Sequence, residues 1–249
     1  TGRTIASAAW VTKVSYVKVE TPEIAGYTPD TSVVDKPTVR TNQEVTVTYT
    51  ANSAKALVRF IDNTENRTLD NLELPGKTGE TIDFAKANAQ LNSYLAHGYK
   101  LVANGIPTTE TKFDTSDDTK GPSQVFVVKL DHDTVTVTPE NPVNPGDKIN
   151  KNVPDSPTYT PDQATVTEDH TLTVHYVGAP KNPADNLQKS HWTREVTIDK
   201  VTGETISSTD WATKDSYVKV GTPEIAGYTP DKSVVDKPTV RTNQEVTVT

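Results

Sequence analysis

The sequence contains no cysteine and no methionine. Without thiols, the chain can form no disulfide, no iron–sulfur cluster and no cysteine-ligated zinc site. Small secreted domains often depend on disulfides, so the domains of this chain must fold on packing and hydrogen bonds alone. Because the sequence does not begin with methionine, we expect it to be an internal part of a longer protein whose targeting signals lie elsewhere.

Apolar and aromatic residues are scarce as well. Hydrophobic residues make up 33% of the sequence and aromatic residues 6%, whereas an average globular chain is about 45–50% apolar. This composition predicts several small domains with modest cores rather than one large enzyme with a deep pocket. No apolar run approaches the ~18 residues that suggest a transmembrane helix, so we expect no membrane insertion.

Positive charge is in short supply, and the formal net charge is −8. Nucleic acids bind to basic surfaces, so this charge argues against a nucleic-acid partner and against electrostatic docking on anionic lipid. The sequence also lacks a Gly-x-Ser-x-Gly elbow, a His-Glu-x-x-His helix and a phosphate-binding glycine loop. We therefore expect a protein that is not an enzyme.

The most prominent feature that is present is a long internal duplication. Residues 1–48 recur as residues 202–249, and only eight of the 48 positions differ, namely positions 3, 6, 8, 9, 11, 14, 20 and 31 of the first copy. Such near-identity indicates recent tandem duplication. The chain therefore contains one complete repeat, residues 49–249, preceded by the end of another.

Both copies contain a Gly-Tyr-Thr-Pro-Asp turn, at residues 26–30 and 227–231. Glycine and proline favour tight turns, and exposed turns often carry function. Aromatic faces suit the apolar faces of sugar rings, so Tyr27 and Tyr228 are the candidate ligand-binding residues, with core packing as the alternative. For the three tryptophans we expect core packing, because small domains need their large side chains.

Residues 51–133 show the order strand, strand, helix, strand, strand. The helix is predicted by apolar residues at helical spacing, with Asp83 as its N-cap and Gly98 at its C-terminal end. Its apolar face comprises Phe84, Ala87, Leu91, Tyr94 and Leu95. This order favours a β-grasp, ubiquitin-like domain in which the helix covers one face of a mixed sheet.

The domain boundaries follow from these patterns. Residues 1–50 are predicted to be the truncated C-terminal part of a preceding second domain, and residues 134–165 a Pro-rich linker. Residues 166–249 are predicted to be a second, mostly antiparallel β-domain, of which the first copy lacks two strands and so has exposed edges. The predicted fold class is mainly β with one helix (α+β), as tandem small β-grasp domains in an elongated array.

One acidic loop partly matches a calcium-binding pattern. Asp114, Ser116 and Asp118 occupy its first, third and fifth positions, and Asp117 lies beside them. The glycine comes two places late, and Val125 stands where a bidentate Glu is required. Calcium at Asp114, Asp117 and Asp118 is thus one interpretation, and a solvated acidic loop is the other. We expect no further cofactor.

Three groups of residues together point to a known family. The first group is residues 58–62, Leu-Pro-Gly-Lys-Thr-Gly at 74–79 and His-Gly-Tyr-Lys-Leu-Val at 97–102; the second is Thr-Val-Thr-Pro-Glu-Asn-Pro at 136–142; the third is Thr-Val-His-Tyr at 173–176, Trp-Thr-Arg at 192–194, Asp-Lys-Val-Thr-Gly-Glu at 199–204, Trp211 and the turn at 227–231. In this order they resemble the repeats of lactobacillus mucus-binding proteins, the mucin-binding adhesins of Gram-positive bacteria, over nearly the whole chain.

The resemblance implies an extracellular adhesin repeat, anchored to a Gram-positive cell wall and monomeric within a long array. Its implied partners are mucin glycoproteins, bound through glycans with weak affinity at each site and with multivalent avidity. The family has no compact site motif, so the resemblance assigns no ligand-binding residue. Two alternatives remain open, an immunoglobulin-binding module and a stalk spacer that binds nothing.

Overall fold

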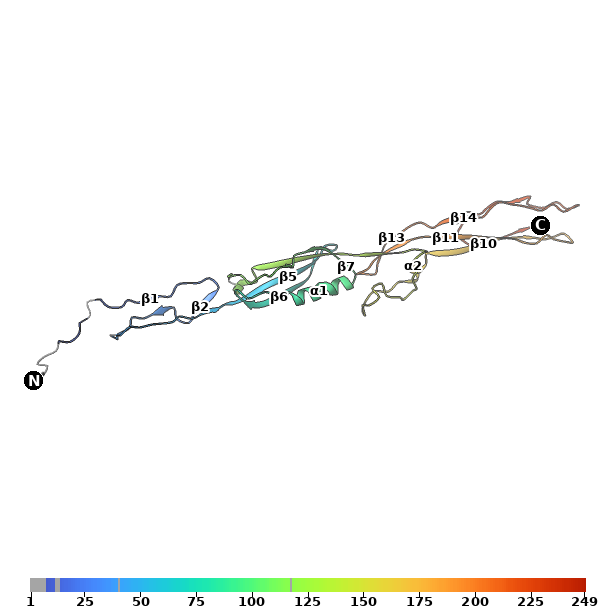
Figure 1. Cartoon of the computed structure of the whole chain (residues 1–249). Helices are drawn as coiled ribbons and strands as arrows, with labels where there is room; N and C mark the ends of the chain where they lie inside the picture. The colour runs from blue at the N-terminus through green and yellow to red at the C-terminus, as the bar shows by residue number, and fades with distance from the viewer. Residues whose placement is uncertain (1–7, 12–13, 40, 117) are drawn as a thin grey trace, which may run out of the picture. The chain divides into compact units, whose positions relative to one another are not determined.

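The structure is a computed structural model of the 249-residue chain, and it describes residues 8–11, 14–39, 41–116 and 118–249. It divides into two compact units. The first unit consists of Thr1–Gln90 and Leu101–Leu130, and the second of Leu91–Lys100 and Asp131–Thr249. Strands predominate among the described residues, so the chain is mainly β with few helices, as the sequence predicts (Figure 1).

The largest sheet of the N-terminal half has four strands in the order β6-β5-β8-β7. Their bounds are β5 Ser53–Asp62, β6 Arg67–Lys77, β7 Tyr99–Asn104 and β8 Gln124–His132. The central strands β5 and β8 run parallel, with Ala56 opposite Gln124 and Asp62 opposite Leu130. A parallel central pair requires a crossover connection, which α1 supplies. The topology is compatible with a β-grasp.

Helix α1 (Ala85–Ala96) begins and ends where the sequence predicts. The Asp83 carboxylate accepts a hydrogen bond from the N–H of Ala85 (2.8 Å), which satisfies one of the free donors at a helix N-terminus. Just beyond the other end, Gly98 has a φ of 95°, the left-handed conformation that terminates many helices. A short 3₁₀ helix, η1 (Asp118–Lys120), precedes β8.

The buried face of α1 is narrower than predicted. Ala87 and Leu91 are buried, whereas Leu95 is 37% exposed. At the start of the helix, the Phe84 ring stands edge-on to the Phe126 ring of β8, with centroids 5.1 Å apart. This pair packs the N-terminal end of the helical segment against the sheet, and Figure 1 shows α1 alongside the strands of that sheet.

The described residues of the first duplicated copy take part in two small sheets. Strand β1 (Val19–Glu20) pairs with β3 (Val33–Val34), and β2 (Tyr27–Pro29) pairs with β4 (Tyr49–Ala51). Residues 43–47 form no strand, and Val45 is 62% exposed. Among the residues that the structure describes, these have no partner strand.

The second copy takes part in a larger sheet of the second unit, with strands in the order β14-β11-β10-β17. The bounds are β10 Thr167–Tyr176, β11 Asn186–Thr193, β14 Ala212–Asp215 and β17 Gln244–Val248. The sheet is mostly antiparallel, and the one parallel pair in it is β10 with β17. A two-stranded sheet of β15 (Val220–Gly221) and β16 (Val234–Val235) contributes to the same core, which comprises Leu172, Val174, Tyr176, Tyr217, Val220, Val235 and Val248.

Residues 134–165 are packed, unlike the extended spacer that their prolines suggest. Strand β9 (Thr134–Val137) pairs with β12 (Val196–Asp199), which also pairs with β13 (Thr205–Ser208). A single helical turn, α2 (Pro161–Ala164), starts at a capping box between Thr160 and Gln163. Apolar residues between the prolines join one core cluster, which comprises Val137, Ile149, Tyr159, Val166, Val196 and Ile198.

Candidate functional site

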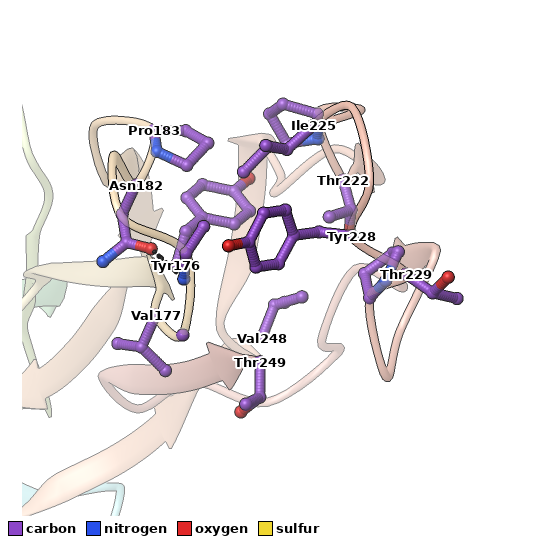
Figure 2. Close-up of a pocket in the computed structure, with 14 residues that line it drawn as sticks. Tyr176, Val177, Asn182, Pro183, Thr222, Ile225, Tyr228, Thr229, Val248 and Thr249 are labelled. Carbon is purple, nitrogen blue, oxygen red and sulfur yellow. Dashed lines mark hydrogen bonds between the residues drawn. The ribbon is translucent and has the colours of Figure 1, made fainter.

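The Gly-Tyr-Thr-Pro-Asp turn of the second copy, residues 227–231, borders a pocket of about 230 Å³ (Figure 2). Thr222, Tyr228 and Val248 line it from the duplicated segment. The loop between β10 and β11 contributes Asn182 and Pro183 from the opposite side. The pocket lies wholly within the second unit.

Backbone geometry holds the turn beside this pocket. Gly227 has a φ of 84°, a conformation that a residue with a Cβ rarely adopts. The N–H of Tyr228 donates to the carbonyl oxygen of Ile225 (3.0 Å). At the pocket's edge, the Asp231 carboxylate accepts a hydrogen bond from the N–H of Thr249 (2.7 Å), and this bond lowers the pKa of Asp231. The turn is therefore a defined structure with an ionised carboxylate at its end.

Tyr228 projects into the middle of the pocket, and its side chain is half exposed. Beside it, Tyr176 is buried in the core and presents the end of its ring to the pocket. Aromatic and proline surfaces next to the Asn182 amide combine apolar and hydrogen-bonding groups, as sugar-binding sites require. The volume is below the ~300–1,000 Å³ of pockets for drug-sized ligands, so it suits a small group such as one sugar ring.

Tyr27, the equivalent residue of the first copy, lies in a covered turn. Its strand β2 pairs with β4, and the N–H of Asn52 donates to the carbonyl oxygen of Gly26 (2.8 Å). Its hydroxyl faces Gly79 so closely that a Cβ on that glycine would lie 3.2 Å away. The two predicted ligand-binding tyrosines therefore have identical local sequences and different surroundings.

In the acidic loop, the carboxylates hold backbone groups. Asp118 accepts hydrogen bonds from the N–H of Lys55 (2.7 Å) and of Ser123 (2.9 Å). Burial acts to raise the pKa of Asp118, but these two hydrogen bonds, together with one from the Ser123 side chain and the charge of Lys55, lower it. Asp114 accepts from the N–H of Ser116 (2.9 Å), and Asp117 lies outside the described residues. These bonds fix the loop shape, and calcium binding at this loop stays a prediction.

The structure also shows an aromatic site that the sequence patterns did not indicate. The guanidinium groups of Arg194 and Arg241 lie 4.9 and 4.3 Å from the ring centroid of Trp211. Arg241 also forms an ion pair with Glu168 (2.5 Å). The arrangement is a cation–π stack that joins β-strand ends of the second domain. In the first copy, Trp10 is 83% exposed, so core packing does not hold for that tryptophan.

Comparison with known families divides the chain into matched segments. A model described as "Muc B2-like domain" matches residues 1–53 and 161–249. A model described as "Mucin binding domain" matches residues 54–132. None of the curated proteins that were compared matches the chain.

Three solved structures are similar to the chain. The crystal structure of Mub-RV is 24% identical, covers 78% of this chain and 96% of its own, and has a TM-score of 0.55, which supports the fold. The type 2 repeat of the mucus binding protein MUB from Lactobacillus reuteri is 28% identical, with coverage of 78% and 97% and a TM-score of 0.47. The MucBP domain of the adhesion protein from Pediococcus pentosaceus is 33% identical, with coverage of 32% and 94% and a TM-score of 0.28. Because the first family model matches more than half of the residues, the chain belongs to the Muc B2-like domain family.

Proposed function

We propose that this chain is part of an extracellular bacterial adhesin that binds mucin glycoproteins through their glycans. The observation that carries the proposal is the pair of family models, which together match residues 1–132 and 161–249. Two of the similar structures are parts of a mucus binding protein and of an adhesion protein, which supports the same role. The proposed activity is binding, with no catalytic step.

The charge of the chain limits how it would recognise a glycan. With a net charge of −8, general attraction to sialylated or sulfated mucin is unfavourable. Recognition would instead rest on hydrogen bonds and on stacking against an aromatic face. The pocket at Tyr228 offers both, so we propose Tyr228 as a glycan-contacting residue. Tyr27 is the equivalent proposed contact, but it would have to be uncovered first.

Weak single-site affinity with multivalent avidity is the expected mode of binding. A pocket of about 230 Å³ with a half-exposed tyrosine buries little ligand surface, while association still costs translational and rotational freedom. Linked copies of a weak site can raise overall affinity by roughly 10²–10⁴ without any new contact. A duplicated chain is therefore suited to adhesion to a large polymeric ligand.

The proposed location is the cell-wall-anchored surface of a Gram-positive bacterium, where the chain would act as a monomer within a repeat array. No helix among the described residues is long and apolar enough to span a membrane.

The glycan proposal is tested by binding of this chain to immobilised mucin before and after periodate oxidation of the glycans. We expect binding to fall strongly after oxidation. We also expect Tyr228→Ala to weaken binding, because it removes the ring from the open pocket, whereas Tyr27→Ala serves as the matched control in the covered turn. Binding that survives glycan oxidation unchanged would contradict the proposal.

A second candidate function is binding to immunoglobulins, and one observation favours it. Strand β7 is an edge of its sheet, and its residues 100–104 are all exposed. Such an edge can accept a strand from another protein. Titration with non-immune antibody fragments tests this alternative, and no signal at high micromolar concentration would dismiss it. A stalk spacer, the third option, would bind neither ligand.

A further inference from the structure

The Gly-Tyr-Thr-Pro-Asp turn occurs in two surroundings within one chain. Residues 21–30 and residues 222–231 have identical sequences. In the first copy, other parts of the chain cover the turn; in the second, the turn borders an open pocket. Because the local sequence is the same, the first copy shows which structure can cover the second.

Backbone pairing provides the first part of the cover. Strand β4 pairs with β2 so that Tyr27 lies opposite Ala51 and Thr28 opposite Thr50. The Tyr49 hydroxyl donates a hydrogen bond to the carbonyl oxygen of Pro22 (2.5 Å). These contacts use main-chain groups and one aromatic side chain, and they fix the register of the pair.

A second element, the turn after β6, closes the cover. The N–H of Thr78 donates to the carbonyl oxygen of Asn52 (3.0 Å), and the Thr28 hydroxyl donates to the Asn52 side-chain oxygen (2.6 Å). A Cβ on Gly26 would lie 2.6 Å from a Thr78 side-chain carbon, so only a glycine fits at this contact. The interface is therefore close-packed and specific to small residues.

The second copy presents the same groups without the cover. A Cβ on Gly227 would meet nothing within 4 Å. Tyr228 is 49% exposed, and Pro223 and Thr229, the equivalents of Pro22 and Thr28, line the pocket. Thr249 is the equivalent of Thr48, which the covering residues 49–52 follow directly in the first copy.

We propose that the pocket at Tyr228 is a docking site for a second copy of the helix-bearing domain together with the strand before it, residues 49–133. The docked copy pairs its residues 49–52 with residues 228–230 and places its Thr78 and Gly79 over Gly227 and Tyr228. The inference goes beyond the proposed function and does not depend on it. It makes the duplicated turn a joint between successive domains. A glycan reaches Tyr228 only on a copy that no further domain follows.

The test uses the full chain extended after Thr249 by a second copy of residues 49–133. Tyrosine nitration followed by peptide mapping reports the exposure of each turn. We expect the reactivity of Tyr228 to fall to that of Tyr27 in the same molecule. Tyr228 that stays as reactive as in the original chain overturns the proposal.

A matched substitution separates docking from a general change in the protein. Asn52→Ala in the appended copy removes the acceptor for the Thr229 hydroxyl, and we expect it to restore the reactivity of Tyr228 while leaving Tyr27 protected. The same substitution at the original Asn52 should expose Tyr27 alone. Nitration can also be repeated with mucin glycans added to each chain. If the glycans protect Tyr228 from nitration equally in the original and the extended chain, the pocket is open in both, and the docking proposal is overturned.

Disulfide trapping gives a second measurement. The chain has no cysteine, so an introduced pair is unique. Thr28→Cys with Thr50→Cys is the positive control, because these residues are direct cross-strand partners at a spacing that suits a disulfide. The test pair in the extended chain is Thr229→Cys together with Thr50→Cys in the appended copy. We expect oxidation to remove the free thiols of this pair to the same extent as those of the control pair. Free thiols in that pair, with a closed control pair, overturn the docking model.

Discussion

Single carboxylates tie together backbone segments of this chain that are far apart in sequence. Asp118 joins Lys55 at the start of β5 to Ser123 before β8. Asp133 forms an ion pair with Lys200 (2.7 Å) and thereby joins β9 to the turn after β12. In a chain without disulfides, such residues restrict the loops that apolar packing does not reach.

Acid should weaken the Asp133–Lys200 link. The hydrogen bond from Lys200 lowers the pKa of Asp133 in the folded state. The link therefore contributes stability above the unfolded-state pKa of about 3.9 and loses it as the pH falls through the folded value. We expect Asp133→Asn to lower stability by about 1 kcal/mol or less at neutral pH, because the pair is partly exposed, and to reduce the acid dependence.

Denaturant unfolding of the second unit between pH 7 and pH 2, followed by tryptophan fluorescence, measures this effect. Trp192 and Trp211 both lie in that unit. Lys200→Met is the matched control, because it removes the same link from the other side. Identical pH profiles for the original chain and both variants would show that the ion pair contributes nothing.

The hydroxyl of Tyr217 is buried in the core without a hydrogen-bond partner among the described residues. The residue is 2% exposed. A buried polar group without a partner costs about 1–3 kcal/mol, so Tyr217→Phe should be neutral or stabilise the fold by about 1 kcal/mol. Thermal unfolding measures the change, with Tyr16→Phe in the exposed equivalent position as the control. Clear destabilisation by Tyr217→Phe would reveal an unrecognised polar role.

At the scale of elements, the sequence predicted the helix well and the proline-rich segment poorly. Asp83 and Gly98 mark the ends of α1 through local chemistry, so a local pattern sufficed. Residues 134–165 fold because their apolar residues meet β12, which lies about sixty positions later, and no local pattern records that contact. The one usable signal was the Thr160–Gln163 capping box, which predicts a helix start at Pro161.

The parallel pairing of β17 with β10 should show in hydrogen exchange. Residues 244–248 pair with β10, whereas the identical residues 43–47 form no strand. Identical sequence makes the intrinsic exchange rates nearly equal, so any difference reports structure. We expect the amides within β17 to exchange far more slowly than those of residues 43–47. NMR resolves the two copies, and equal rates would contradict the pairing.

At the scale of the whole molecule, the candidate site illustrates a limit of sequence reasoning. Tyr27 and Tyr228 share every neighbour for several residues on either side, so any local rule assigns them the same role. Their exposure differs because β4 and the turn at Thr78 cover one of them. The family could be predicted from motifs spread along the chain, whereas the state of each site depends on the domain that follows it.

Repeat number should control the strength of mucin binding if the proposed function is correct and Tyr228 stays open in every copy. We expect chains with one, two and four tandem copies of residues 49–249 to dissociate from a mucin surface progressively more slowly, and by more than the number of sites, because linked sites rebind at high effective concentration. Surface plasmon resonance at fixed mucin density measures the dissociation rates. Rates that do not change with copy number would favour either a Tyr228 that each following domain covers or a repeat that binds nothing, and binding of a single copy to mucin distinguishes the two.

The parallel pairs also determine how the chain bears a pulling force. In the four-stranded sheet that carries α1, the central strands are β5 and β8, and in the four-stranded sheet of the second unit the first strand in sequence is β10 and the last is β17. In each case these two strands lie side by side and run in the same direction. Tension applied through the chain ends then loads the interstrand hydrogen bonds in shear, so they must break together instead of one by one. We therefore expect both sheets to resist unfolding under tension without a disulfide.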